Sequence, residues 1–131
     1  MTKAILIVDD EGSFRFAASL SLRQEGYEVS EAQNGKEAFK MITDRQRLGR
    51  PYDLIVLDIQ MPEVNGLELF GDLRKLGIAT PVIFITGYAD EHAMSLASHQ
   101  ADSNLLRKPF EAKTLVNMVD RMLGVKTAKT G

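Results

Sequence analysis

Three short segments of apolar, largely β-branched residues place the strongest limit on how this chain can fold. They are AILIV at residues 4–8, LIVL at 54–57 and VIFI at 82–85. Strands without polar alternation are typical of a parallel sheet that helices cover on both faces. Shorter apolar segments at 27–29 and 105–106 supply two further candidate strands. The chain therefore predicts a five-stranded parallel sheet.

Helical patterns alternate with these segments. We expect helices over residues 13–25, 66–76, 90–98 and 111–123. Another helix begins at Asn34, whose side chain can cap it while Glu37 reaches back. A strand and a helix that alternate five times favour an α/β fold, in which a doubly wound sheet carries helices on both faces. Residues 44–51 are expected to form a polar loop before the third strand.

Length and composition bound the class of protein. The 131 residues fit one domain, which we expect at 1–124, with a frayed tail or the start of a linker at 125–131. Lys and Arg number 16 against 18 Asp and Glu, so direct contact with nucleic acid or a membrane is not expected. The absence of cysteine excludes disulfides and thiolate zinc sites and favours a reducing compartment. The apolar segments are far shorter than the ~20 residues that cross a bilayer, so we expect a cytoplasmic protein.

Polar residues mark the carboxyl ends of four predicted strands. They are Asp9, Asp10 and Glu11 at the first strand, Asp58 at the third, Thr86 at the fourth and Lys108 at the fifth. Any one of them alone is more often a cap or loop residue. In an open α/β sheet, however, ligands bind beyond the carboxyl ends of the strands where the strand order reverses. The combination therefore indicates a site.

Carboxylates brought this close together need a compensating cation. Two like charges about 4 Å apart repel by ~4 kcal/mol at an effective dielectric constant near 20, so the cluster either raises its pKa values or binds a cation. Mg²⁺ is the expected cofactor because it prefers oxygen ligands and is commonly held by one or two carboxylates. His92 and His99 lie away from this cluster in the sequence, and we interpret both as surface or packing residues.

A phosphoryl group suits this set of side chains. The metal and Lys108 would neutralise its oxygens, Thr86 would donate a hydrogen bond, and a carboxylate would attack phosphorus to form an acyl phosphate. Asp58 is the expected nucleophile because it stands alone at the end of a central strand. Asp9 and Asp10 form the expected metal pair on the neighbouring strand.

Four separated motifs resemble the receiver domain of two-component response regulators. They are IVDDE at 7–11, LDIQMPEVNG at 57–66, ITG at 85–87 and KPF at 108–110. The resemblance covers about residues 3–123 and implies a flavodoxin-like sheet with strand order 2-1-3-4-5 and five helices. It also implies a cis peptide bond between Lys108 and Pro109.

The resemblance implies a role for each site residue. Asp58 would accept a phosphoryl group from a sensor histidine kinase or a histidine phosphotransfer protein. The implied ligands of Mg²⁺ are Asp9, Asp10, Asp58 and the backbone carbonyl of Gln60. Thr86 and Lys108 would bind the phosphoryl group and shift the conformation of the output face. The domain would assist its own phosphorylation and dephosphorylation without being an enzyme.

Two features of this chain bear on the output. Leu105 occupies the position where related receivers usually carry an aromatic switch residue, so a readout through that rotamer is missing. A downstream effector or a second copy of the chain would still bind through the face from the fourth to the fifth helix. Gln60 and Tyr88 would flank the phosphoryl group, and we expect them to set how fast water reaches the acyl phosphate.

An apolar pair on the first predicted helix faces away from the core. At 100° per residue, Phe16 and Leu20 fall nearly opposite the face that carries Phe14, Ala18 and Leu22. Receivers that this chain resembles meet their phosphodonor with this helix. We therefore expect Phe16 and Leu20 to form a docking patch for the partner, although exposed apolar residues without a role are also common.

Three alternatives remain at this stage. A haloacid-dehalogenase type phosphatase also uses an Asp nucleophile with magnesium, but it needs a second Asp where this chain has Gln60. A flavodoxin-type nucleotide binder needs a glycine-rich phosphate loop, where this chain has the Asp9, Asp10 and Glu11 carboxylates, which repel phosphate. A receiver-like module that acts without phosphorylation usually lacks one of the acids, the threonine or the lysine.

Overall fold

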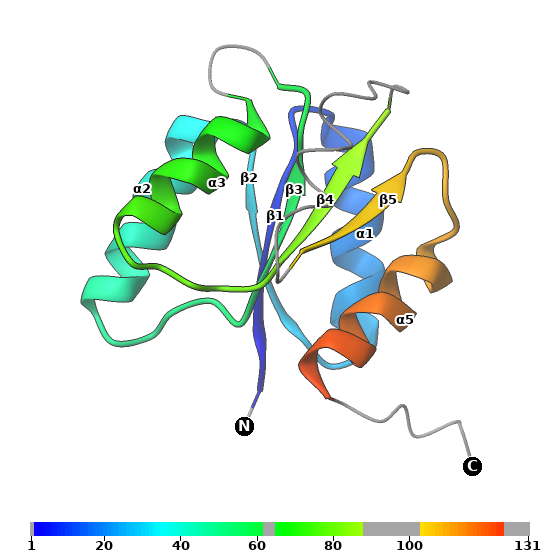
Figure 1. Ribbon diagram of the computed structural model, residues 1–131. Helices are drawn as coiled ribbons and strands as arrows, with labels where there is room; N and C mark the ends of the chain where they lie inside the picture. The colour runs from blue at the N-terminus through cyan, green and yellow to red at the C-terminus, as the bar shows by residue number, and fades with distance from the viewer. Residues whose placement is uncertain (1, 62–64, 88–102, 125–131) are drawn as a thin grey trace.

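A computed structural model describes residues 2–61, 65–87 and 103–124 of the chain. Five parallel strands form one sheet in the order β2-β1-β3-β4-β5. Helices α2 and α3 cover one face of the sheet, and α1 and α5 cover the other (Figure 1). The predicted fold class and strand order are therefore confirmed.

The elements follow one another as the apolar pattern predicts. The strands are β1 (Ala4–Val8), β2 (Glu28–Ala32), β3 (Leu54–Asp58), β4 (Val82–Thr86) and β5 (Ser103–Arg107), and the helices are α1 (Gly12–Gln24), α2 (Gly35–Arg47), α3 (Gly66–Lys75) and α5 (Ala112–Leu123). The expected helix at 90–98, Tyr88, both histidines and the expected tail at 125–131 lie outside the described residues. The fifth helix thus stays a prediction, and four helices are present in the described ranges.

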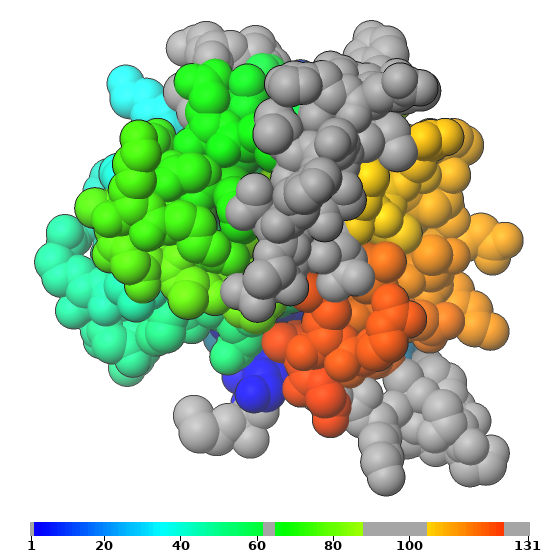
Figure 2. Space-filling model, in the orientation of Figure 1, coloured from blue at the N-terminus to red at the C-terminus, as the bar shows by residue number. Residues whose placement is uncertain are grey.

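Alternate residues of the central strands serve two separate cores. In β1, Leu6 and Val8 pack on the side of α2 and α3, whereas Ile5 and Ile7 pack on the side of α1 and α5. This division explains why β1 is apolar at every position, since neither face of the strand meets water. In Figure 2, α2 and α3 form one flank of the molecule and β5 and α5 form the other.

The helix starts confirm the capping prediction, but one loop is shorter than expected. The Asn34 side chain accepts the N–H of Glu37 at 2.8 Å, and Asn65 caps α3 through the N–H of Glu68 at 2.9 Å. The prediction of a loop from residue 44 is wrong, because α2 continues to Arg47. Asp44 forms ion pairs along this last turn with Lys40 and Arg47, which favour the helical form.

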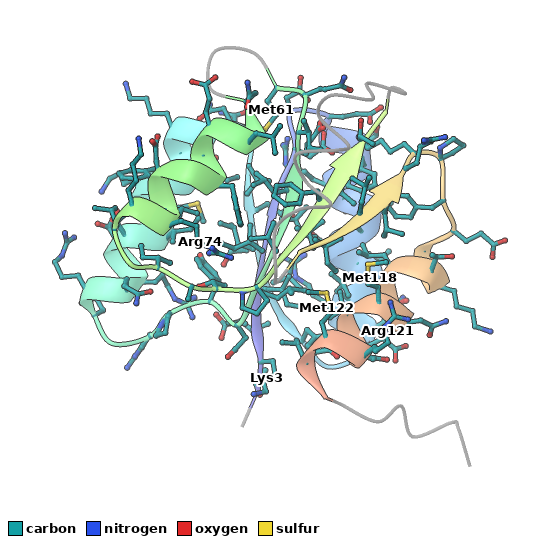
Figure 3. The ribbon with its side chains drawn as sticks, in the orientation of Figure 1. Lys3, Met61, Arg74, Met118, Arg121 and Met122 are labelled. Atoms are coloured by element: carbon teal, nitrogen blue, oxygen red, sulfur yellow. The ribbon has the colours of Figure 1, made fainter. Side chains whose placement is uncertain are left out.

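One arginine fastens the connection that leads into β4. The Arg74 guanidinium donates to the carbonyl oxygens of Ile78 at 2.7 Å and Thr80 at 3.0 Å. It also lies 4.3 Å from the ring centre of Phe70, between α3 and the connection (Figure 3). On the opposite face, the Tyr27 hydroxyl donates to the buried carboxylate of Asp120 in α5. Both contacts fix helices against the sheet that carries the strand ends.

The start of α3 lies against the carboxyl end of β3. The Gly66 N–H donates to the Ile59 carbonyl at 2.9 Å, and a Cβ at Gly66 would stand 2.3 Å from the Asp58 carbonyl oxygen and 2.9 Å from the Ile59 Cα. These neighbours are backbone atoms that cannot rotate away. Glycine is therefore required at position 66 to keep the end of β3 in place.

We expect Gly66→Ala to lower the free energy of unfolding by about 1–3 kcal/mol, the cost of overpacking against a fixed neighbour. Gly71→Ala is the matched control, because a Cβ at Gly71 meets nothing within 4 Å in the same helix. The control should gain up to ~1 kcal/mol from the higher helix propensity of alanine. Urea unfolding of both variants measures the difference, and equal stabilities would contradict the close contact at Gly66.

Candidate functional site

Three carboxylates meet at the carboxyl edge of the sheet. Because Val8 is level with Leu57 in the pairing of β1 with β3, the residues that follow them come together. One oxygen each from Asp9, Asp10 and Asp58 lies within 4.8 Å of the others. Asp9 and Asp58 are buried, whereas Asp10 is exposed. The structure therefore brings the three predicted carboxylates together.

Asp9 is held on three sides. Its Oδ1 accepts the backbone N–H of Glu11 at 2.8 Å, and its Oδ2 accepts the Lys108 ammonium at 2.8 Å. Its backbone carbonyl accepts the Arg15 guanidinium at 2.6 Å. Each carboxylate oxygen of Asp9 thus already accepts one hydrogen bond, and each keeps a lone pair for a metal ion or for a metal-bound water.

Asp58 occupies the floor of the cluster. Its residue surface is 5% exposed, and Oδ1 accepts the Gln60 N–H at 2.9 Å. Burial raises the pKa of Asp58 to about 7; the Gln60 N–H and Lys108 oppose this rise, and the charges of Asp9 and Asp10 add to it. Without a cation, the protein therefore holds this carboxyl near its titration midpoint at neutral pH.

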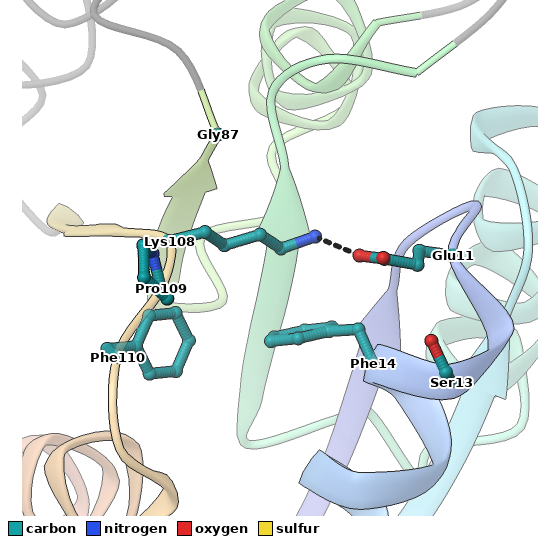
Figure 4. A pocket seen from close by; sticks show the side chains of 7 residues that line it. All are labelled: Glu11, Ser13, Phe14, Gly87, Lys108, Pro109 and Phe110. Carbon is teal, nitrogen blue, oxygen red and sulfur yellow. Dashed lines mark hydrogen bonds and ion pairs between the residues drawn. The ribbon is translucent and has the colours of Figure 1, made fainter.

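Lys108 reaches the cluster from the opposite side. Its Nζ lies 2.8 Å from Asp9 Oδ2 and 3.1 Å from Glu11 Oε1, and it stands 4.2 Å from the ring centre of Phe14 (Figure 4). Burial alone would lower the pKa of Lys108, but the hydrogen bonds to Asp9 and Glu11 raise it above its usual value. The lysine is therefore a firmly charged cation. The peptide bond from Lys108 to Pro109 is cis, as the resemblance implies.

An open hollow lies above the carboxylates. It has a volume of about 440 Å³ and is lined by Asp10, Glu11, Asp58, Gln60, Gly87 and Lys108. Thr86 is fully buried at the end of β4, directly before Gly87. The Thr86 carbonyl accepts the Lys108 N–H at 2.8 Å, which ties the end of β4 to the start of the lysine loop. The hollow is polar, open to solvent and large enough for a phosphoryl group.

Oxygen donors of this kind fit Mg²⁺. The cluster offers hard carboxylate oxygens and no nitrogen or sulfur ligand among the residues described, which is the donor set that Mg²⁺ selects. Asp9, Asp10 and Asp58 each offer an oxygen to such an ion, and the hydrogen bonds that Asp9 and Asp58 accept hold those oxygens in place. Gln60 lines the same hollow as these acids.

Leu105, Phe16 and Leu20 lie apart from this hollow. Leu105 is half-buried in β5 and packs against the core under α2 and α3. Phe16 and Leu20 are 66% and 47% exposed on α1, as the helical pattern predicts. Tyr88 is outside the described part of the chain.

Sequence reasoning missed two residues that shape the site, and one contact of a residue that it had placed there. Glu11 pairs with Lys108, Phe14 faces the same ammonium, and Arg15 holds the Asp9 carbonyl. The place of Glu11 beside two acids was a visible signal for an electrostatic role. The helical pattern predicts Phe14 only as a residue of the core face, and nothing in the pattern around Arg15 indicates a contact with the Asp9 carbonyl.

Comparison with known proteins places the chain among signalling domains. The response regulator receiver domain family matches residues 5–120. A probable transcriptional regulatory protein of Picosynechococcus sp. is 38% identical over 118 residues, which cover 88% of this chain and 47% of that protein. The sensor kinase CckA of Brucella abortus is 35% identical over 119 residues, or 91% of this chain and 12% of the kinase.

Solved structures agree with the sequence relatives. A CheY-like response regulator receiver domain protein from Methanospirillum hungatei has a TM-score of 0.84 and 29% identity, with all of both chains covered. The chain spans about half or less of the length of the curated relatives described above. In the described ranges, no helix is both long and apolar enough to cross a membrane. The matched span, the sheet order and the motifs at the strand ends agree, and the chain belongs to the response regulator receiver domain family.

Proposed function

We propose that this domain is a phosphorylation switch of a two-component system in which Asp58 accepts the phosphoryl group. The observation that carries the proposal is the convergence of Asp9, Asp10 and Asp58 within 4.8 Å, with Lys108 bound to the same cluster. A sensor histidine kinase or a histidine phosphotransfer protein is the proposed donor. The sequence favours this function over a phosphatase, because the residue two positions after Asp58 is Gln60, which has no acidic side chain.

The proposed chemistry is a single phosphoryl transfer. A carboxylate oxygen of Asp58 attacks phosphorus, an O–P bond forms, and the P–N bond of the donor phosphohistidine breaks as imidazole leaves with the electron pair. The Gln60 N–H fixes one Asp58 oxygen at 2.9 Å, which orients the carboxylate. Lys108 supplies positive charge at the same hollow. Bound Mg²⁺ would supply further neutralisation of the phosphoryl oxygens.

The output of the switch follows from the contacts that the new group makes. A phosphoryl group shifts a conformational equilibrium only by the difference between its interactions with the two states. Thr86 ends β4, Lys108 directly follows the adjacent β5, and a hydrogen bond joins their backbones, so we propose that both move toward the phosphoryl group. Leu105 is packed in the core as an aliphatic side chain, which favours a readout by backbone shifts of β4 and β5.

The central test uses a small-molecule phosphodonor. We expect acetyl phosphate with Mg²⁺ to add one phosphoryl mass to the protein, whereas Asp58→Asn should gain none, because its amide cannot act as the nucleophile. Intact mass spectrometry measures the gain. Asp53→Asn is the matched control, since Asp53 binds the Ala4 N–H at 2.7 Å away from the hollow. A mass gain that survives in Asp58→Asn would contradict the proposal.

The exposed apolar pair on α1 is the proposed contact for the protein donor. Replacing both Phe16 and Leu20 by Ser should slow phosphotransfer from a cognate donor about tenfold or more, because buried apolar anchors dominate interface energy. Phosphorylation by acetyl phosphate should remain unchanged. Leu48→Ser is the control, as Leu48 is 72% exposed at the end of α2. Equal transfer rates for all three proteins would show that the pair has no docking role.

The protonation of Asp58 predicts how stability varies with pH. Without metal, its pKa of about 7 lies above the ~3.9 expected for an unfolded Asp. Between these values the unfolded chain releases a proton that the folded chain keeps, so stability falls as pH rises from about 4 to 7 and is level above. Asp58→Asn should therefore exceed the wild type in stability by about 1–3 kcal/mol at pH 8. Thermal unfolding at pH 5 and pH 8 in chelator tests this, and a pH-independent difference would contradict it.

A further inference from the structure

The Lys108 ammonium is paired with carboxylates other than that of Asp58. Its ammonium contacts Asp9 at 2.8 Å and Glu11 at 3.1 Å. Both partners belong to the connection between β1 and α1, and in the described part of the chain no ion pair joins Lys108 to Asp58. The cation that is needed at the phosphoryl group is therefore held by other carboxylates beforehand.

Glu11 stands between two hollows. Glu11, Gly87 and Lys108 line the acidic hollow above Asp58 and also line a second hollow of about 510 Å³. The second hollow is walled by the rings of Phe14 and Phe110, which meet edge to face at 5.7 Å. In Figure 4 the side chain of Lys108 extends across this space toward Glu11. The ion pair thus lies where the two hollows share their lining.

The two partners of Lys108 differ in how easily they release it. The Asp9 side chain is 1% exposed, so loss of the ammonium would leave a buried carboxylate short of a donor. The Glu11 side chain is 58% exposed, and water can replace the lysine there at low cost. The contact with Glu11 is therefore the one that can break and re-form during a switching cycle.

We propose that Glu11 is a positioning residue that holds the Lys108 ammonium on the α1 side and competes for it with the phosphoryl group on Asp58. The inference rests on the proposed function of Asp58. A charge that binds the lysine only in the resting state stabilises that state, because a contact shifts an equilibrium by its difference between the two conformations. Glu11 therefore lowers the fraction of protein that is phosphorylated at a given donor concentration.

The test is a titration with acetyl phosphate at saturating Mg²⁺, read by intact mass. Glu11→Gln should lower the concentration that gives half-phosphorylation by about two- to fivefold, the range open to a partly exposed ion pair. The same substitution in a Lys108→Met background should have no effect, since the cation for which Glu11 competes is gone. Glu111→Gln, which removes one exposed charge at the start of α5, should match the wild type.

A second readout follows the lysine directly. The Nζ resonance of Lys108 in ¹⁵N-lysine-labelled protein should shift on phosphorylation, and in resting Glu11→Gln it should lie closer to the phosphorylated position. An unchanged half-phosphorylation concentration in Glu11→Gln, or the same decrease with Lys108→Met, would overturn the role of Glu11. If the wild type and Asp58→Asn gained phosphoryl mass equally, the proposed function would fail as well.

Discussion

The repulsion among carboxylates at one edge of a parallel sheet is the constraint to which the rest of this structure responds. Parallel strands end at the same edge of the sheet, so the acids that follow β1 and the acid that ends β3 lie close together. Two like unit charges about 4 Å apart repel by ~4 kcal/mol at an effective dielectric constant near 20. The protein answers in two ways: the pKa of Asp58 rises because of its burial and its acidic neighbours, and Lys108 pairs with Asp9.

The tightest packing described in this fold holds the carboxyl ends of β1 and β3 in place. Gly66 allows α3 to start against the backbone of Asp58, and Arg15 and Glu11 fix Asp9 through backbone and side-chain hydrogen bonds. Neither face of β1 or β3 is exposed, so the strands have little freedom to move apart. A cluster that repels itself is thereby kept assembled by apolar burial elsewhere.

Much of this arrangement could be predicted from the sequence, for reasons that differ between residues. The apolar pattern of β1, β3 and β4 and the polar residues at their ends were enough to predict that Asp9, Asp10 and Asp58 meet at one edge of the sheet. The sequence did not predict that α2 continues to Arg47, because residues 44–47 are polar and show no apolar periodicity. The ion pairs of Asp44 that favour the helix there are visible only in the structure. The choice of Glu11 as a partner of Lys108 also escaped prediction, since it depends on side-chain positions that no spacing specifies.

The charge balance of the site links metal, proton and phosphoryl group. With Lys108 as the ammonium in contact with Asp9 and Glu11, the metal-free cluster retains an excess of negative charge, and Asp58, whose pKa is raised to about 7, is partly protonated near neutral pH. A nucleophile must be ionised, whereas an incoming phosphoryl group is itself negative. A divalent cation resolves both demands, because it favours the ionised carboxylate and offsets the added charge. Metal affinity should accordingly weaken as this proton binds, so that metal and proton act on Asp58 as competitors.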